Sequence, residues 1–320
     1  MVSSLVDTLL TLILLAGAGF VAFRHPWMQK KLFPTFLVLV LDILFPLYFV
    51  FRIPQGWEEA LVLGWPFMVG MFLLSLVSMA VQGWLAGRVV RWKPEWVSNP
   101  TTFVLLAALH NAGFVPLPII ERLTPGPIVI GMSFYFLAFN LVIWTVAVSV
   151  IRTGRFSIRH FRIKPTAALG GLVIGLALSM TGAYRHIPEQ VMTIGGHLGN
   201  LGLDLALVAL GGALAGISEK LSFDREHWFF VGWRMILFPL AVVGLTALPL
   251  PVFSGPLGWP IRLVLILEAA VPPATLVLVV TRAYGRPEQL HYTGSMMLFS
   301  YLVSLVTIPL FITLAVVLYG

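Results

Sequence analysis

Three carboxylic acids lie inside long apolar stretches of this 320-residue sequence: Asp42, Asp204 and Glu268. A charged side chain at the bilayer centre costs about 2.5–3.5 kcal/mol on insertion scales, so such residues usually face a cavity or a partner. A carboxyl group that takes up a proton or a cation can couple transport to an ion gradient; the alternative is a hydrogen-bonded structural carboxyl. We expect coupling at Glu268, four residues before a proline, and leave both roles open for Asp42 and Asp204.

Two apolar stretches contain prolines near their centres. One reads HNAGFVPLP and includes Asn111, Gly113 and Pro116; the other reads EAAVPPAT and includes Pro272 and Thr275. Proline lacks an N–H and clashes with the preceding turn, so both helices are predicted to break at mid-depth. Half-helices that begin at such breaks direct partial positive charge and free N–H groups at one spot. Although one proline usually only kinks a helix, two matched breaks favour a site for a small anion, with Asn111 and Thr275 as neutral hydrogen-bonding partners.

The sequence offers little for other chemistry. It has no cysteine, which excludes thiol chemistry and disulfides. His110 has no second His or Cys at metal-ligand spacing, and no ATP-binding motif is present, so neither a metal nor a cofactor is expected. Arg234 lies about a turn and a half into its apolar stretch, and we expect its side chain to snorkel to the membrane surface.

The elements that must position these residues are membrane helices. Hydrophobic residues make up 59% of the chain and charged residues 10%, against about 45–50% and 25% in soluble domains. Water-soluble enzymes, secreted disulfide scaffolds and nucleic-acid binders are therefore excluded. A helix needs about 20 apolar residues to cross the hydrocarbon. Ten such stretches are predicted: 5–23, 32–51, 61–86, 101–120, 127–151, 166–184, 198–216, 228–249, 260–281 and 293–319.

The positive charges of the connections predict the orientation. Fifteen Lys and Arg residues lie in the odd-numbered connections and four in or beside the even-numbered ones. The four are Arg52, Arg122, Arg185 and Arg262. Because cytoplasmic loops carry the excess of positive charge, the odd-numbered connections are predicted to be cytoplasmic and both termini outside. We expect the protein in the plasma (inner) membrane.

The most basic connection divides the chain near its middle. The division gives a first half at 1–151, a linker at 152–165 and a second half at 166–320, each half with five predicted helices. Five is odd, so a second half like the first must enter the membrane in the opposite sense. Asp42 and Asp204 are 162 residues apart, and Pro116 and Pro272 are 156 apart. Two pairs at similar offsets support an inverted repeat, which is typical of secondary transporters.

Several segments resemble the auxin efflux carrier family, which includes the plant PIN-FORMED carriers and bacterial membrane transport proteins. The more specific segments are HNAGFVPLPII (110–120) and LEAAVPPATLVLVVTRAYG (267–285). FYFLAFNLVIWTVAV (134–148) and YLVSLVTIPLF (301–311) also match, and weaker likenesses cover much of the rest in the same order.

The resemblance implies an all-α membrane protein with ten transmembrane helices in two inverted five-helix repeats, similar to the bile acid:sodium symporter fold. It implies that helices 4 and 9 cross at their prolines, and that a transport domain (helices 3–5 and 8–10) moves like an elevator against a scaffold (helices 1, 2, 6 and 7). It also implies a homodimer. An organic carboxylate would bind at the crossing; carried over by motif, its site residues are Asn111, Gly113, Pro116, Ala270, Pro272 and Thr275.

The chain departs from the family where Glu268 replaces the usual glutamine and Asp42 the usual asparagine. Both changes add potential negative charge near the expected anion site. The sequence therefore predicts a secondary transporter and not an enzyme, moving a small organic anion such as a dicarboxylate or an auxin-like acid, driven by protons or by membrane potential. Two alternatives remain open: a sodium-coupled anion symporter on the same fold, and an intramembrane aspartyl protease using Asp42 and Asp204.

Overall fold

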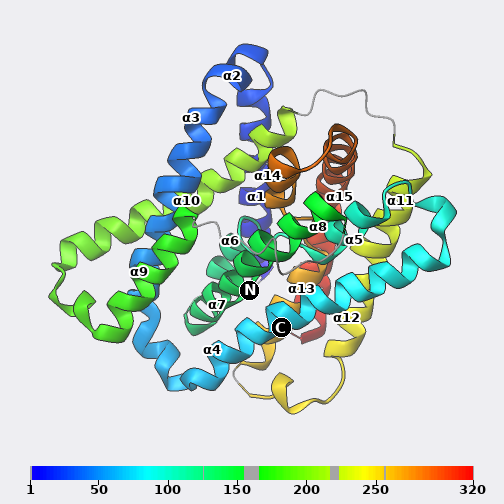
Figure 1. Ribbon diagram of the computed structural model, residues 1–320. Coiled ribbons are helices and arrows are strands. Elements are labelled where there is room, and N and C mark those ends of the chain that lie inside the picture. Colours follow the sequence, from blue (N-terminus) through cyan, green and yellow to red (C-terminus); the bar gives the residue numbers. More distant parts are fainter. Residues whose placement is uncertain (1, 125, 155–165, 217–222, 256, 320) are drawn as a thin grey trace.

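The computed structural model describes residues 2–124, 126–154, 166–216, 223–255 and 257–319 (Figure 1). Within these ranges the chain is helical and its only β-type pairing is one isolated bridge. Six helices in the described part are long and apolar enough to cross a membrane, which supports an integral membrane protein. They are Val6–Phe23, Phe33–Trp92, Pro127–Thr153, Glu189–Ala215, Arg225–Thr246 and Pro287–Tyr319. The arrangement of ten spans stays a prediction.

The first half of the chain contains one long bent helix and one broken helix. Its elements are α1 (Val2–Phe23), α2 (Pro26–Lys31), α3 (Phe33–Val38), the π-helical turn η1 (Leu39–Leu44), α4 (Phe45–Trp92), η2 (Pro94–Trp96), α5 (Pro100–Ala108), α6 (Pro116–Leu123), α7 (Pro127–Val142), η3 (Ile143–Ala147) and α8 (Val148–Thr153). Of the predicted linker at 152–165, only residues 152–154 are described, where α8 ends at the left-handed Gly154.

The second half also contains a broken helix, between α13 and α14. Its elements are α9 (Ala167–Thr181), η5 (Ala183–His186), α10 (Glu189–Ala215), α11 (Arg225–Val231), η6 (Gly232–Leu237), α12 (Phe238–Thr246), η7 (Pro251–Phe253), α13 (Gly258–Ala270), α14 (Thr275–Tyr284) and α15 (Pro287–Tyr319). The predicted breaks near Pro116 and Pro272 are therefore present, because the helices stop at Ala108 and Ala270 and resume at Pro116 and Thr275.

The helix from Phe33 to Trp92 runs through 60 residues. A straight helix of that length would span about 90 Å, three times the hydrocarbon thickness of about 30 Å. Gly64 interrupts it with φ 75° and ψ 167°, and Figure 1 shows α4 turning sharply at the bottom. The predicted connection at 52–60 is wrong, since these residues are helical and the bend lies beyond them. Only glycine adopts the positive φ of this bend readily, which fixes its place.

Four elements pack closely through glycine: α1, the part of α4 before Gly64, α9 and α10. We call them the glycine-packed set. A Cβ at Gly211 of α10 would collide with the carbonyl oxygen of Ala16 on α1, and one at Gly171 of α9 would collide with the backbone of Pro46 on α4. Small residues that let backbones approach are typical of helix contacts in membranes. The part of α4 after Gly64 together with α5–α8 and α11–α15 forms the crossover set, which contains both broken helices.

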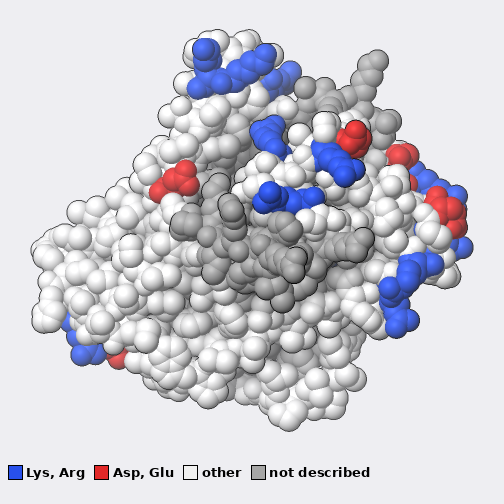
Figure 2. All heavy atoms as spheres, viewed as in Figure 1, with Lys and Arg blue, Asp and Glu red and all other residues white. Residues whose placement is uncertain are grey.

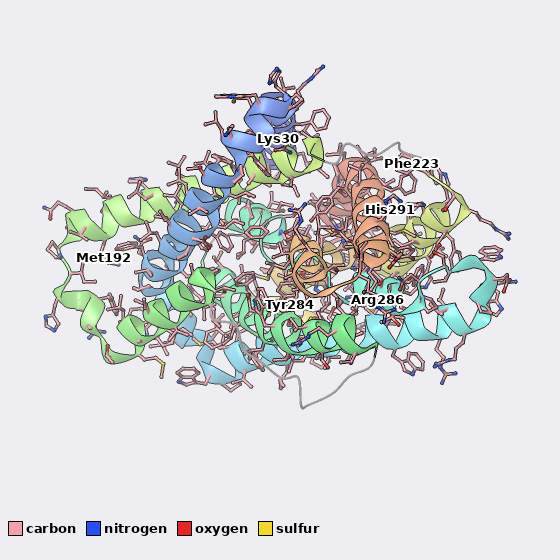
Figure 3. All side chains as sticks on the ribbon, turned by 45° about the horizontal axis from the view of Figure 1, so that its top comes forward. Lys30, Met192, Phe223, Tyr284, Arg286 and His291 are labelled. Carbon is pink, nitrogen blue, oxygen red and sulfur yellow. The ribbon has the colours of Figure 1, made fainter. Side chains whose placement is uncertain are left out.

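Charged side chains gather at the ends of the helices. Figure 2 shows Lys and Arg at the top, over the upper middle and along the right-hand side, with one further charged group at the lower left and wide uncharged areas over the rest of the left and the bottom. Figure 3 places Lys30 at the tip of α2 and Arg286 and His291 near the turn between α14 and α15, whereas Met192 lies at the far end of α10. An uncharged belt below a basic rim is the surface expected of a helical bundle in a bilayer.

Candidate functional site

The two breaks meet, and their unwound backbones pair with each other. The Asn111 N–H donates to the Pro272 carbonyl at 3.0 Å, and the Ala274 N–H donates to the Leu109 carbonyl at 2.8 Å. His110 and Pro273 face each other between these bonds as an antiparallel bridge. Backbone polar groups without helical partners are tolerated at membrane depth only inside protein or beside a cavity, and here each segment supplies partners to the other.

Four helix ends converge at this crossing: the C-termini of α5 and α13 and the N-termini of α6 and α14. The C-terminal ends carry partial negative charge and unpaired carbonyls. Arg234 of η6 neutralises the partial charge and pairs a carbonyl at each of these two ends. Its Nε donates to the Ala107 carbonyl at 3.0 Å, and its Nη1 donates to the Ala269 carbonyl. One guanidinium thus caps two half-helices that come from opposite halves of the chain.

The expected snorkelling of Arg234 is wrong. The residue is fully buried and is the largest fully buried side chain of the described structure. A snorkelling arginine would hold its charge in the headgroup layer, whereas this one is drawn inward by two helix C-termini whose position depends on the tertiary fold. The position of Arg234 relative to the end of its helix does not reveal that the carbonyls of Ala107 and Ala269 lie beside it.

Asn111 organises the unwound segment of the first broken helix. Its Oδ1 accepts from the Phe114 N–H at 3.1 Å and lies 3.4 Å from the Gly113 N–H, and its Nδ2 donates to the Tyr301 hydroxyl at 3.0 Å. The Tyr301 hydroxyl in turn donates to the Pro273 carbonyl at 3.0 Å. Asn111 is buried with only 2% of its surface exposed, so most of its hydrogen-bonding capacity is used to hold the crossing.

The two helix N-termini at the crossing offer different numbers of donors. At α6, Pro116 and Pro118 have no N–H, and the Leu117 N–H is already donated to the Gly113 carbonyl at 3.1 Å. At α14, Thr275 occupies the first position and is half-buried. Its hydroxyl has no hydrogen-bond partner among the described residues. The α14 N-terminus with Thr275 therefore presents the free donors of this site.

The remaining motif residues, Gly113 and Ala270, are small and let other groups pack closely at the crossing. A Cβ at Gly113 would lie 2.7 Å from Cε2 of Phe136 on α7, so glycine is needed for this contact. Ala270 is the buried last residue of α13. A pocket of about 50 Å³ lies beside Val115, lined by apolar side chains of α1, α10 and α15 and by Ser304. Its volume has room for a few water molecules.

A cluster of buried polar side chains lies behind the crossing. His110 Nε2 is 2.7 Å from the Tyr135 hydroxyl and 3.0 Å from Glu268 Oε2, and His110 Nδ1 is 3.2 Å from Gln82 Nε2. Glu268 is 2% exposed, and neither of its carboxyl oxygens has a well-aligned hydrogen bond within the described residues. Gln82 is held by a bond of 2.8 Å to Ser78 on the same helix. We call Gln82, His110, Tyr135, Arg234 and Glu268 the polar cluster.

Asp42 and Asp204 lie away from this cluster. Asp42, in η1, is exposed, whereas Asp204 on α10 pairs with Arg122 of α6, whose Nη2 lies 2.6 Å from Asp204 Oδ1. A protease dyad needs two carboxyls that share a proton. Within the described residues no hydrogen bond joins Asp42 to Asp204, so the structure gives the protease alternative no support. Among those residues no group of three or more His, Cys, Asp or Glu side chains could hold a metal ion.

Sequence reasoning missed Arg234, Tyr135, Gln82 and Tyr301 as parts of the site. A usable signal existed for Arg234, since a charge inside WFFVGWRMILFP costs as much as the acids that were singled out. Tyr135, Gln82 and Tyr301 carried no such signal, because polar residues of their kind are common in membrane helices.

Comparison with known proteins agrees with this geometry. A family model described as membrane transport protein matches residues 4–162 and again residues 153–312. The two matches together cover nearly the whole chain and confirm the resemblance seen in its motifs. Curated proteins give no match to this sequence. With a family match of this extent and a pair of crossed, proline-broken helices, the chain belongs to the membrane transport protein family.

Proposed function

We propose that this protein is a secondary transporter that moves a small organic anion across the plasma (inner) membrane by alternating access. The observation that carries the proposal is the antiparallel pairing of the two unwound segments, with Asn111 N donating to Pro272 O. Broken helices that meet inside an apolar protein are the arrangement by which transporters present helix ends to a substrate. Family membership supports the same conclusion.

The substrate carboxylate binds at the N-terminus of α14. Thr275 donates a hydroxyl hydrogen bond, and the free N–H groups of the first turn add partial positive charge. Asn111, Gly113, Pro116, Ala270 and Pro272 form the frame around it. Arg234 strengthens the preference for an anion, because its charge is buried at the same crossing.

The movement is elevator-like, with the crossover set sliding against the glycine-packed set. Support comes from the pocket beside Val115, which lies between the crossing and the helices α1 and α10 of the glycine-packed set. This pocket holds a few water molecules, and we expect α1 and α10 to move away from the crossing when substrate enters. The basic rim is cytoplasmic and both termini lie outside, by the positive-inside rule.

Transport of the anion is driven by protons or by the membrane potential, with Glu268 as the coupling carboxyl. Asp42 and Asp204 are secondary candidates for the same role. A sodium-coupled symporter is the second candidate function, favoured by the two Glu268 oxygens without aligned hydrogen bonds among the described residues.

The test is uptake into proteoliposomes. Labelled pyruvate, malonate, succinate and indole-3-acetate are offered under a proton gradient, a sodium gradient or a potassium-diffusion potential, with protein-free vesicles as background. The Thr275→Val variant removes one hydroxyl without changing shape, and we expect KM to rise about tenfold or more, as for a lost hydrogen bond to a charged group. Thr181→Val, at the exposed end of α9, is the matched control. Absence of uptake for every anion under every gradient would refute the proposal.

The homodimer implied by the family resemblance is tested separately. Light scattering coupled to size-exclusion chromatography gives the protein mass within the detergent micelle, and a mass of one chain would refute a stable dimer.

A further inference from the structure

We infer that the polar cluster behind the crossing binds one proton for each anion carried, so that proton and anion travel together in a fixed ratio. The inference rests on the proposed function and adds to it a stoichiometry and a second residue, His110. Its basis is the arrangement of charges on three buried side chains: His110, Arg234 and Glu268.

The site for the proton is the pair formed by His110 and Glu268. His110 Nε2 and Glu268 Oε2 are 3.0 Å apart, and the side chains of the two residues are 0% and 3% exposed. The carboxyl group has no aligned hydrogen bond within the described residues, whereas the imidazole already contacts Tyr135 and Gln82 through its two nitrogens. A hydronium ion gives its proton to a Glu268 oxygen and leaves as water, and the new O–H is shared with the imidazole; on release the proton returns to water.

The groups that face this pair come from four elements. Helix α4 contributes Gln82, together with Ser75 and Ser78; α7 contributes Tyr135; η6 contributes Arg234; and α13 carries Glu268 itself. Arg234 lies next to this pair, because its Nη1 donates to the carbonyl of Ala269, the residue that follows Glu268. Among these side chains only Arg234 has a fixed positive charge, since a guanidinium stays protonated in proteins.

The charge of the cluster therefore has two values. With Glu268 ionised and His110 neutral, the negative charge balances Arg234 and the cluster is neutral. With one proton bound, the cluster carries one positive charge. A buried net charge in an apolar surrounding is costly, so the protonated cluster is stabilised when an anion lies nearby.

The proposed anion site belongs to the same crossing as this pair. His110 is the residue of the crossing that pairs with Pro273, and its side chain enters the polar cluster, whereas the adjacent Asn111 holds the anion side of the same segment. Arg234 caps the carbonyls of Ala107 and Ala269, which end the two half-helices at this crossing. Proton and monoanion bound together leave this part of the protein neutral, as does the empty state.

Only the neutral states cross the membrane readily. The empty transporter and the transporter loaded with both proton and monoanion move, whereas a transporter with either one alone carries an uncompensated charge. Proton and anion are thereby coupled without any direct contact between them. For a dianion the same cluster still supplies one proton, and the loaded state then carries one negative charge, so it crosses more slowly than the state loaded with a monoanion and its movement depends on the membrane potential.

The experiment counts protons and anions in the same vesicles. Wild-type proteoliposomes contain the pH dye pyranine, the potential is clamped with potassium and valinomycin, and labelled pyruvate and malonate are the probes. We expect one proton to enter with each anion. Pyruvate uptake is then independent of the clamped potential, whereas malonate uptake depends on it.

The Glu268→Gln variant gives a second readout. Its cluster is permanently positive, so the anion-loaded state is neutral without a proton but the empty state is charged. We expect exchange of labelled for unlabelled pyruvate to continue without proton movement, and net uptake to fall at least about tenfold because the empty carrier returns slowly. Glu58→Gln is the matched control, because Glu58 pairs at the surface with Arg185 and its side chain is 61% exposed.

The outcomes separate this inference from the proposed function. Anion uptake driven by potential or sodium without proton movement would overturn the inference and leave the proposed function standing. Proton-coupled net uptake at the wild-type rate in Glu268→Gln, or loss of its exchange together with its net uptake, would overturn the assignment to Glu268. If no anion moves in the wild type, the proposed function fails and the inference fails with it.

Discussion

Arg122 on α6 and Asp204 on α10 form an ion pair, with Nη2 and Oδ1 2.6 Å apart, that joins the crossover set to the glycine-packed set. The preceding residue, Glu121, reaches a different helix of the same set, because it accepts from Arg52 on α4 at 2.8 Å. Two consecutive residues of α6 therefore hold it against two helices. Any sliding of the crossover set must break both contacts.

Breaking these two contacts costs little free energy. The side chains of Arg122 and Asp204 are 30% and 40% exposed, and ion pairs of this kind contribute about 0–1 kcal/mol. A double-mutant cycle with Arg122→Gln and Asp204→Asn, read out as thermal unfolding in detergent, is therefore expected to give a coupling free energy below about 1 kcal/mol. A coupling free energy several times larger would show that Arg122 and Asp204 hold the two sets together permanently.

Arg234→Met is expected to destabilise the protein strongly. The substitution leaves the buried carbonyls of Ala107 and Ala269 without a donor, at about 1–3 kcal/mol for each unsatisfied group. Arg234→Lys keeps the charge but replaces the planar fork with a single ammonium, so it restores only part of the stability. Thermal unfolding of both variants measures this. Arg185→Met, at a side chain that is 66% exposed, is the control, and an equal loss there would contradict a special role for Arg234.

Gly113→Ala is expected to push the ring of Phe136 out of place. The added Cβ would lie 2.7 Å from Cε2 of that ring, which also packs against Phe45 and Phe49 of α4. Overpacking of this kind costs about 1–3 kcal/mol. The second substitution Phe136→Leu makes room, so the double variant is expected to be more stable than the sum of the single changes predicts. Simple additivity in thermal unfolding would mean that the two side chains do not meet.

Tyr301→Phe removes the hydroxyl that joins Asn111 Nδ2 to the Pro273 carbonyl. Because both partners are buried, the expected loss is about 1–3 kcal/mol of stability. We also expect weaker substrate binding, since the two unwound segments lose a tie beside the anion site. Tyr184→Phe, whose hydroxyl bonds to Glu58 at an exposed position, is the control. If substrate affinity and thermal unfolding of Tyr301→Phe equal those of the wild type, the Tyr301 hydroxyl does not stabilise the site.

The parts of this fold that follow from local chemistry were predictable. Prolines in matching apolar stretches of the two halves, Pro116 and Pro272, indicated both interruptions from the sequence alone, whereas single prolines such as Pro54 and Pro309 lie inside continuous helices. The apolar stretches likewise predicted the helices, because hydropathy is a property of each segment. At α4 the prediction failed over residues 52–60, since the polar residues there suggested a connection while the true bend depends on the positive φ of Gly64.

The parts that depend on distant partners were not predictable. Arg234 belongs to the crossing only because α5 and α13 end beside it, and their C-termini come from residues more than a hundred positions apart. Asn111 was expected to bind substrate, yet the structure directs its side chain mainly to its own backbone and to Tyr301. In both cases the residue type was noticed, but its partners were fixed by tertiary contacts that a single sequence does not reveal.

The backbone pairing between the two breaks also has a consequence for synthesis. Residues 109–111 enter the membrane early, yet their partners at 272–274 and the guanidinium of Arg234 are made much later. Until then the first broken helix holds unpaired carbonyl and N–H groups in a medium that offers them no water. The first broken helix is therefore satisfied only after residues 272–274 have been made, and a nascent protein arrested before α14 keeps an unpaired break inside the membrane.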